Sequence, residues 1–428
     1  MNLSDQQLFE ALCVLIALLG SCYLLYGVAR GLSRSREGFA IGKPLAVAFG
    51  VRLLAAIALG QLAVARDLRG GDELTFLVRA KDLAIAPFGG ADALDALTSQ
   101  LHTFIFSMHY RVLETAPPDL LLRIEMITFA VVGVGLLSAA VYELAGARAA
   151  RIAIWILALE PANIFFASLL HKEPLMYLAE GLVAYGGAVL WKRGKLTALF
   201  PMILGCLIAT ATRPYVGWFL TAAAAAVVLH ASLTRQRGLR SFAVTTTCVA
   251  LICVCIPFVW AQSSDEKLSE LQASQDANAS DDEARLSLER VDYSTRENLI
   301  INLPKRVKDV IFRPYVWQTQ NTSQQLGAFG TLIVLACLGL LAMAIARNRR
   351  QIMNAAGPLV YPAGFMLIAY AISAGNAGTA YRYRTHLVGL AVSLVLVILA
   401  HRRQELARAA RVPKRRTLAG VNRTRTAT

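Results

Sequence analysis

Long apolar runs recur along the chain, with short polar segments between them. Each run has about 17 to 22 residues, the length that an α-helix needs to cross a hydrocarbon core of about 30 Å. Strands of a membrane β-barrel would be shorter and would alternate strictly, so the pattern predicts an all-α, polytopic transmembrane bundle. We expect eleven spans, at residues 8–29, 45–65, 124–145, 152–170, 175–191, 196–212, 214–231, 241–261, 326–346, 355–374 and 386–400. No basic residue precedes the first run, which favours a span over a cleaved signal sequence.

Basic clusters between the runs predict the orientation. They lie at 30–43, 146–151, 192–195, 235–240 and 347–350. With eleven spans, all five fall on one side, together with the basic segment 401–428. The excess of Lys and Arg in cytoplasmic loops therefore places this side in the cytoplasm and the N-terminus outside. We expect the cytoplasmic membrane of a bacterium, a transmembrane unit at 1–400 and a disordered cytoplasmic tail at 401–428.

Two long polar segments fall on the opposite, extracytoplasmic face, at 66–123 and 262–325. The first has helical periodicity around 73–86 and 94–113, which predicts short helices along the membrane interface. The second begins acidic and low in aromatics, which is typical of a solvated helix and linker. It continues as "NLPKRVKDVIFRPYVWQTQ", a composition that suits an amphipathic segment at lipid headgroups.

The composition agrees with a membrane protein, because 56% of the 428 residues are hydrophobic and the net charge is +15. Such a charge can indicate nucleic-acid binding, but here it lies in short clusters between apolar runs, so we expect membrane lipid and no nucleic acid as a partner. All seven cysteines fall inside apolar runs. Their spacing predicts neither a disulfide framework nor a metal site.

Charged side chains gather at the predicted extracytoplasmic edge. Their positions are Asp72 and Glu73 after two glycines, His171, Lys172 and Glu173 between the fourth and fifth spans, Arg213 after the sixth, and Arg382 and Arg384 beside Tyr381 and Tyr383 before the last. Cytoplasmic loops normally hold most cations. Cations in these short outer turns therefore indicate an anionic ligand.

These residue types suit the transfer of a sugar from a lipid phosphate. Lys and Arg bind phosphate oxygens and can stabilise the charge of a leaving phosphate, and a neighbouring histidine can add a hydrogen bond. Tyr381 can stack on a sugar or pack on an isoprenoid chain. Asp72, preceded by flexible Gly70 and Gly71, can approach a substrate and take a proton from an acceptor hydroxyl.

Plainer roles are open for each residue. A charge at the end of a span commonly extends to the headgroups, and tyrosines are common at membrane interfaces. Arg213 followed by Pro214 suits a simple turn. Glu160 and Arg52, which fall inside spans, suit a structural pair.

The chain resembles the GT-C glycosyltransferases that use polyprenyl-phosphate sugars, in particular the bacterial protein mannosyltransferase and aminoarabinose transferase group. The resemblance rests on "RGGDELTFLVRAKDLA", "SLLHKEPLMYLAEGLVAYG" and "GNAGTAYRYRTHLVGL". It implies that Asp72, or else Glu73, is the catalytic base. It further implies that Lys172 and Glu173 match a basic-acidic outer turn of related bacterial membrane transferases, and that Arg382 and Arg384 contact the donor phosphate.

The resemblance is partial. Leu74-Thr75-Phe76 stands where the family often has an aromatic pair, and we expect no large C-terminal periplasmic domain. The implied partners are a polyprenyl-phosphate sugar donor and an envelope glycan, lipid or protein acceptor. The cofactor is left unknown, because a divalent metal serves only some branches of the family.

Two alternatives stay open. A polymerase or ligase acting on a polyprenyl-diphosphate glycan would also need outer arginines and a histidine. A transporter or flippase of an anionic lipid or solute predicts polar residues deep in several spans and broken helices near the midplane. Only Arg52, Glu160 and Asn163 fit the transporter pattern, which ranks it below a transferase.

Overall fold

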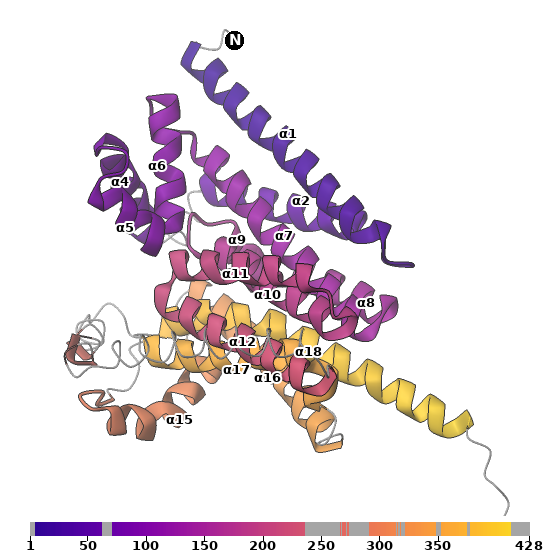
Figure 1. Cartoon of the computed structure of the whole chain (residues 1–428). Helices are drawn as coiled ribbons and strands as arrows, with labels where there is room; N and C mark the ends of the chain where they lie inside the picture. The colour runs from indigo at the N-terminus through magenta and orange to yellow at the C-terminus, as the bar shows by residue number, and fades with distance from the viewer. Residues whose placement is uncertain are drawn as a thin grey trace, which may run out of the picture.

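The computed structural model describes residues 5–61, 71–235, 291–313, 322–347, 352–374 and 377–411, with a few single positions between 266 and 317. Every regular element in these residues is a helix (Figure 1). The elements are α1 (Asp5–Arg34), α2 (Gly42–Gln61), α4 (Gly71–Ile85), α5 (Ala91–Ser99), α6 (Leu101–Leu113), α7 (Asp119–Ala145), α8 (Ala147–Leu159), α9 (Pro161–Ala167), α10 (Glu173–Arg193), η1 (Leu196–Ala198), α11 (Leu199–Thr212), α12 (Pro214–Arg235), α15 (Arg296–Phe312), α16 (Thr322–Arg347), α17 (Ile352–Ser373) and α18 (Ala377–Arg411).

Six helices of the described chain are long and apolar enough to cross a membrane. They are α1, α2, α7, α12, α17 and most of α18. The prediction of an all-α membrane protein is thereby confirmed. The other predicted spans within the described residues coincide with helices α8 to α11 and α16, while the predicted span at 241–261 lies outside them. The count of eleven spans stays a prediction.

The predicted fourth span, 152–170, is not one straight helix. Helix α8 ends at Leu159, and α9 begins at Pro161 with its axis turned by 56°. Proline has no backbone N–H to donate at Pro161, so the helix breaks there. Polar side chains satisfy the freed groups: Glu160 accepts the N–H groups of Ala162 and Asn163.

Buried Arg52 completes this break from the neighbouring helix α2. It donates to the carbonyl oxygens of Leu157 (3.2 Å) and Ala158 (2.8 Å) at the end of α8, and to the side-chain oxygen of Asn163. Arg52 and Glu160 form no direct ion pair, in contrast to the pairing suggested by the sequence. Arg52 instead binds the free carbonyls at the end of α8, and Glu160 binds the free N–H groups at the start of α9. A helix end inside a bundle needs such partners for its free backbone groups.

Helix α10 is the centre of the bundle and packs against α7, α11, α12, α17 and α18. Its contact with α7 is made by two glycines. A Cβ atom added to Gly133 would lie 2.3 Å from the backbone oxygen of Tyr177, and one added to Gly181 would lie 2.5 Å from the backbone oxygen of Gly133. The two backbones touch directly, as small residues allow in membrane helix pairs.

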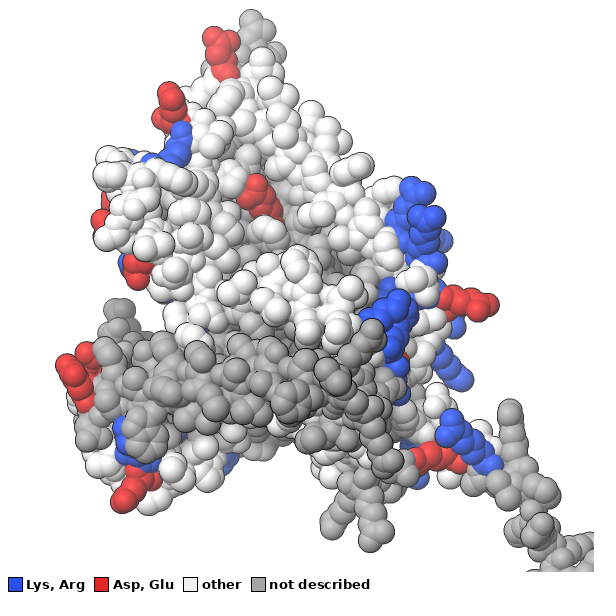
Figure 2. Space-filling model, in the orientation of Figure 1, with Lys and Arg blue, Asp and Glu red and all other residues white. Residues whose placement is uncertain are grey.

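The two ends of the bundle differ in composition. Helices α4, α5, α6 and α15 lie at the left of Figure 1, which we call the α4–α6 end. Lys and Arg gather at the right (Figure 2), where α1 ends, α8 begins and α18 runs out of the bundle. At this basic end, Glu143 of α7, whose side chain is 4% exposed, binds Arg36 (2.7 Å) and Arg193 (2.7 Å), which ties α7 to the end of α10.

The segment predicted as two short helices has a different division. The expected helix at 73–86 is α4, but the one at 94–113 is split at Gln100 into α5 and α6. The hydroxyls of Thr98 and Ser99 donate to the carbonyls of Leu94 and Asp95, and such local bonds favour a helix end.

Two more boundaries differ from the predicted spans. Helix α18 starts at Ala377, well before the predicted 386, so that Arg382 and Arg384 lie within it. It continues to Arg411, which makes residues 401–411 of the predicted tail helical. Residues 412–428 lie outside the described part of the chain.

Candidate functional site

The N-terminal ends of four helices carry the predicted site residues. Helix α4 begins at Gly71, α10 at Glu173, α12 at Pro214 and α18 at Ala377. The first turn of a helix has free N–H groups and the positive end of its dipole, so each of these ends favours negative charge. Residues from these ends meet in one polar network.

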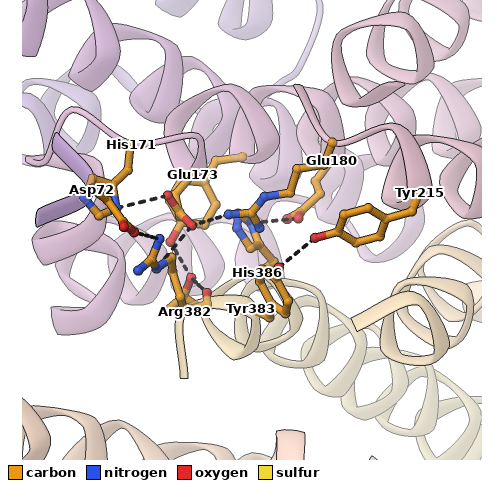
Figure 3. Close-up of polar contacts among 11 residues, drawn as sticks. Asp72, His171, Glu173, Glu180, Tyr215, Arg382, Tyr383 and His386 are labelled. Carbon is orange, nitrogen blue, oxygen red and sulfur yellow. Dashed lines mark hydrogen bonds and ion pairs between the residues drawn. The ribbon is translucent and has the colours of Figure 1, made fainter. Parts of the chain in front are cut away.

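The network is a chain of ion pairs between acids and guanidinium groups (Figure 3). Arg382 Nη1 lies 2.8 Å from Asp72 Oδ2, and its Nε lies 3.9 Å from Glu173 Oε1. The same Glu173 oxygen accepts from Arg213 Nη2 at 2.5 Å. We call Asp72, Glu173, Arg213 and Arg382 the ion cluster. It brings together residues from α4, α10, the α11–α12 turn and α18.

The members of the ion cluster differ in burial. The side chains of Glu173 and Arg213 are 0% and 4% exposed, whereas those of Asp72 and Arg382 are 51% and 24% exposed. Arg213 also lies over the ring of Tyr383 at 4.6 Å. The inner pair is therefore enclosed by protein, while the outer pair stands at a boundary with solvent or ligand.

Glu73, the neighbour of Asp72, points into a different environment. Its carboxylate binds Arg123 of α7 at 2.7 Å and accepts the backbone N–H of Leu170 at 2.8 Å. Arg123 also donates to the carbonyl of Ser168 at 2.6 Å. Glu73 and Arg123 thus fasten α4 to α7 and to the turn that carries His171. The geometry thus distinguishes the two acids that the sequence offered as catalytic base: Asp72 lies in the ion cluster, and Glu73 lies in a structural ion pair.

Lys172 has no acidic partner among the described residues. Its Nζ lies 5.7 Å above the ring of Phe76, and Arg213 and Arg382 are close enough to act on its charge. Burial and, next, the positive charge of Arg213 lower the pKa of Lys172 to about 8. Three cations thus face two carboxylates around this point, which leaves an excess positive charge beside Asp72.

His171 lies next to the ion cluster. Its Nδ1 is 3.7 Å from Glu173 Oε2, and neither ring nitrogen has a hydrogen bond within the described part of the chain. Burial and the charge of Arg382 lower the pKa of His171, so the ring is neutral at pH 7. Phe76 packs edge-on to both His171 and His102, at 6.1 and 4.4 Å between ring centroids.

Charge interactions set the ionisation of the acids. Burial would raise the pKa of Glu173, but Arg213 and Arg382 outweigh it and hold that pKa far below the usual range. Burial would likewise lower the pKa of Arg213, and Glu173 reverses this effect. For Asp72 the charge and hydrogen bond of Arg382 outweigh partial burial and lower the pKa. All three groups are charged at neutral pH.

Two of the predicted residues lie apart from the ion cluster. Arg384 donates to the hydroxyl of Thr331 on α16 and lies 5.7 Å from the ring centroid of Tyr381. Tyr381 itself packs against Phe166 of α9, at 5.4 Å between ring centroids. Arg384 therefore belongs to the α9–α16 side of α18, and the structure brings it into no contact with Asp72, Lys172 or Arg213.

The sequence pattern did not single out the polar residues deeper in the bundle. Glu180 of α10 faces His386 of α18, and Tyr177 bonds Thr385 between the same helices. The signal was present in the spacing, because 173, 177 and 180 lie on one face of a helix. Glu180 falls within the predicted apolar span 175–191, and an ionisable residue inside a span usually has a function.

Within the described residues, no three His, Cys, Asp or Glu side chains lie close enough to share a metal ion. Comparisons of the chain with protein-family models, with curated proteins and with solved structures give no match.

Proposed function

We propose that the chain is an integral membrane glycosyltransferase that takes a sugar from a polyprenyl-phosphate donor and passes it to an envelope acceptor. The observation that carries the proposal is the meeting of Lys172, Arg213 and Arg382 beside the half-exposed carboxylate of Asp72. A phosphate needs such cations, and an attacking hydroxyl needs such a base. The GT-C architecture, the eleven spans and the extracytoplasmic position of the α4–α6 end belong to this proposal.

The exposure of the outer pair supports an exchange on binding. An ion pair as exposed as Asp72–Arg382 contributes no more than about 1 kcal/mol, so the phosphodiester anion of the donor can compete with Asp72 for the guanidinium. Donor binding then moves Arg382 onto the phosphate and frees Asp72 to accept a proton. Lys172, which has no acidic partner in the described chain, supplies the second cation for the phosphate.

Buried residues have supporting roles in this scheme. Arg213 and Glu173 hold each other at fixed positions and keep Arg382 near its place. His171 can donate a hydrogen bond to a bound phosphate oxygen, since its ring nitrogens are free of hydrogen bonds to described residues. Glu73 fixes α4 and takes no part in the proton transfer.

The experiment is turnover of labelled polyprenyl-phosphate sugar by the purified protein in lipid nanodiscs. We expect Asp72→Asn to reduce turnover by about 10²- to 10⁴-fold, the usual contribution of a positioned base. Asp92→Asn is the matched control, because Asp92 also lies in the first turn of a short exposed helix, α5. Full activity of the Asp72→Asn protein would exclude this base. The product mass distinguishes transfer of one sugar from transfer of a preassembled glycan.

A transporter of an anionic lipid or solute is the second candidate, and the break between α8 and α9 favours it. Discontinuous helices with buried polar groups are a feature of transporter sites. Arg52 and Asn163 provide such groups at the break. Counterflow of a labelled anionic solute or lipid in proteoliposomes, in the absence of any acceptor, would replace the transferase proposal with this one.

A further inference from the structure

Helices α10 and α18 are joined by three polar contacts along one seam, and Figure 3 labels the residues of the first and the third. The first is Glu173–Arg382, with 3.9 Å between Oε1 and Nε. The second joins the hydroxyls of Tyr177 and Thr385 at 2.6 Å. The third is Glu180–His386, with 2.8 Å between Oε1 and Nδ1. Residue numbers rise together along both helices, so the seam runs inward from the ion cluster.

The third contact lies deep in the bundle. Glu180 is seven residues beyond Glu173, which is about 10 Å along a helix axis. The side chains of His386 and Glu180 are 0% and 3% exposed. His386 falls inside the apolar stretch of α18 that is long enough to cross a membrane. Ionisable groups in such positions are costly, and they commonly carry protons or ions.

The surroundings of His386 are polar on more than one side. Among the described residues, its ion pair is with Glu180 of α10, and its ring contacts are Tyr177 of α10 (4.5 Å between centroids) and Tyr370 of α17 (5.8 Å). Both of its ring nitrogens, Glu180 Oε1 and the hydroxyl of Tyr370 have no hydrogen-bond partner in this part of the chain. None of these atoms is exposed, so each lacks the hydrogen-bond partner that buried polar atoms normally have.

We propose that His386 and Glu180 form an intramembrane proton-binding site, connected by the Tyr177–Thr385 hydroxyl pair to the ion cluster. In the proton-free state His386 Nδ1 lies 2.8 Å from Glu180 Oε1 without the geometry of a hydrogen bond. On uptake a proton leaves its carrier, a hydronium ion or a protonated ligand, and bonds to the ring nitrogen of His386 that lacks one. The carboxylate of Glu180 stabilises the imidazolium that results.

The seam couples this site to whatever occupies the ion cluster. Glu173 is within electrostatic range of His386, so a change of charge at one end of the seam alters the proton affinity at the other. An anion bound by Lys172 and Arg382 would favour the imidazolium. Binding of an anionic ligand is therefore accompanied by uptake of a proton inside the bundle, a property that the transferase reaction does not require.

The test follows the protonation of each histidine by NMR of full-length protein carrying ¹⁵N-labelled histidine in nanodiscs. The chain has only six histidines, so His386→Gln assigns the signal. Should this variant fail to fold, the signal is assigned by elimination from single substitutions of the other five. We expect the His386 signal to show a change of protonation as the pH is varied, and Glu180→Gln to move the midpoint of that change.

Glu125→Gln is the matched control, since Glu125 binds another histidine, His109, at 2.9 Å. The partial burial of His109 would lower its pKa, but Glu125 outweighs this and raises it. Glu125→Gln should lower the midpoint of His109 and leave that of His386 unchanged. A His386 that keeps one protonation state throughout, or a midpoint that Glu180→Gln does not move, overturns the proposal. No donor or acceptor enters the measurement, so its result is independent of the transferase test.

Discussion

Glu173 and Arg213 form an ion pair with 2.5 Å between Oε1 and Nη2, and neither side chain is more than 4% exposed. The pair joins the start of α10 to the turn between α11 and α12. Removing one partner would leave a buried charge without compensation, which costs about 3–5 kcal/mol. We therefore expect Glu173→Gln to lower the thermal unfolding midpoint strongly. Replacing both residues, by Glu173→Gln with Arg213→Met, should recover part of the loss, and a double variant no more stable than Glu173→Gln would contradict the pairing.

Asp72 and Glu73 provide a comparison between adjacent acids. Glu73→Gln should destabilise the protein by about 3–5 kcal/mol, because it leaves Arg123 unpaired among buried residues. Asp72→Asn should change stability by no more than about 1 kcal/mol, since its pair with Arg382 is half-exposed. Thermal unfolding of the two variants, measured in one detergent, gives both changes in stability. Equal destabilisation by the two changes would contradict the distinction between a structural acid and an available one.

The proposed binding of an anion beside Lys172 should depend on pH. Its pKa is lowered to about 8, so the ammonium charge is lost as the pH rises through about 8. Affinity for a polyprenyl phosphate should then be highest below pH 8 and fall between about pH 7 and about pH 9. In Lys172→Arg the charge persists, because a guanidinium stays protonated, and the fall over this range should disappear. Fluorescence titration with a labelled polyprenyl phosphate checks both proteins, and an identical fall in the two would assign the effect to another group.

The sequence could predict the helices but not all of their details. Apolar runs mark α1, α2, α7, α12 and α17, because each must cover its length with side chains suited to lipid or to the bundle interior. The choice between Asp72 and Glu73 could not be made, because each residue turns about 100° around a helix and the direction of α4 was unknown. Side chains two positions apart on a helix point in directions that differ by about 200° around its axis. Arg382 and Arg384 therefore point to different neighbours. The sequence pattern grouped Arg382 and Arg384 in one site because it predicted that the last span begins only at residue 386, after both of them.

Arg52 gives a prediction for the broken span. Arg52→Met removes the donors that satisfy the carbonyls of Leu157 and Ala158, and each buried carbonyl left without a partner costs about 1–3 kcal/mol. We expect a clear loss of thermal stability. Arg151→Met, on the exposed face of α8, is the control and should leave the unfolding midpoint nearly unchanged. If Arg52→Met were as stable as the control, other groups would have to bind the carbonyls of Leu157 and Ala158.

Gly133 and Gly181 have a consequence for motion in the bundle. Where α7 and α10 touch through their backbones, there is no layer of side chains that could rearrange to let one helix slide past the other. The two helices must therefore move as a single rigid body. Entry of the proposed lipid-linked donor would then depend on displacement of the partners that meet α10 through side chains, above all α18 with Arg382. Glu173 and Glu180 would then lie in the rigid pair of α7 and α10. Arg382 and His386, which contact these two acids, would move with α18.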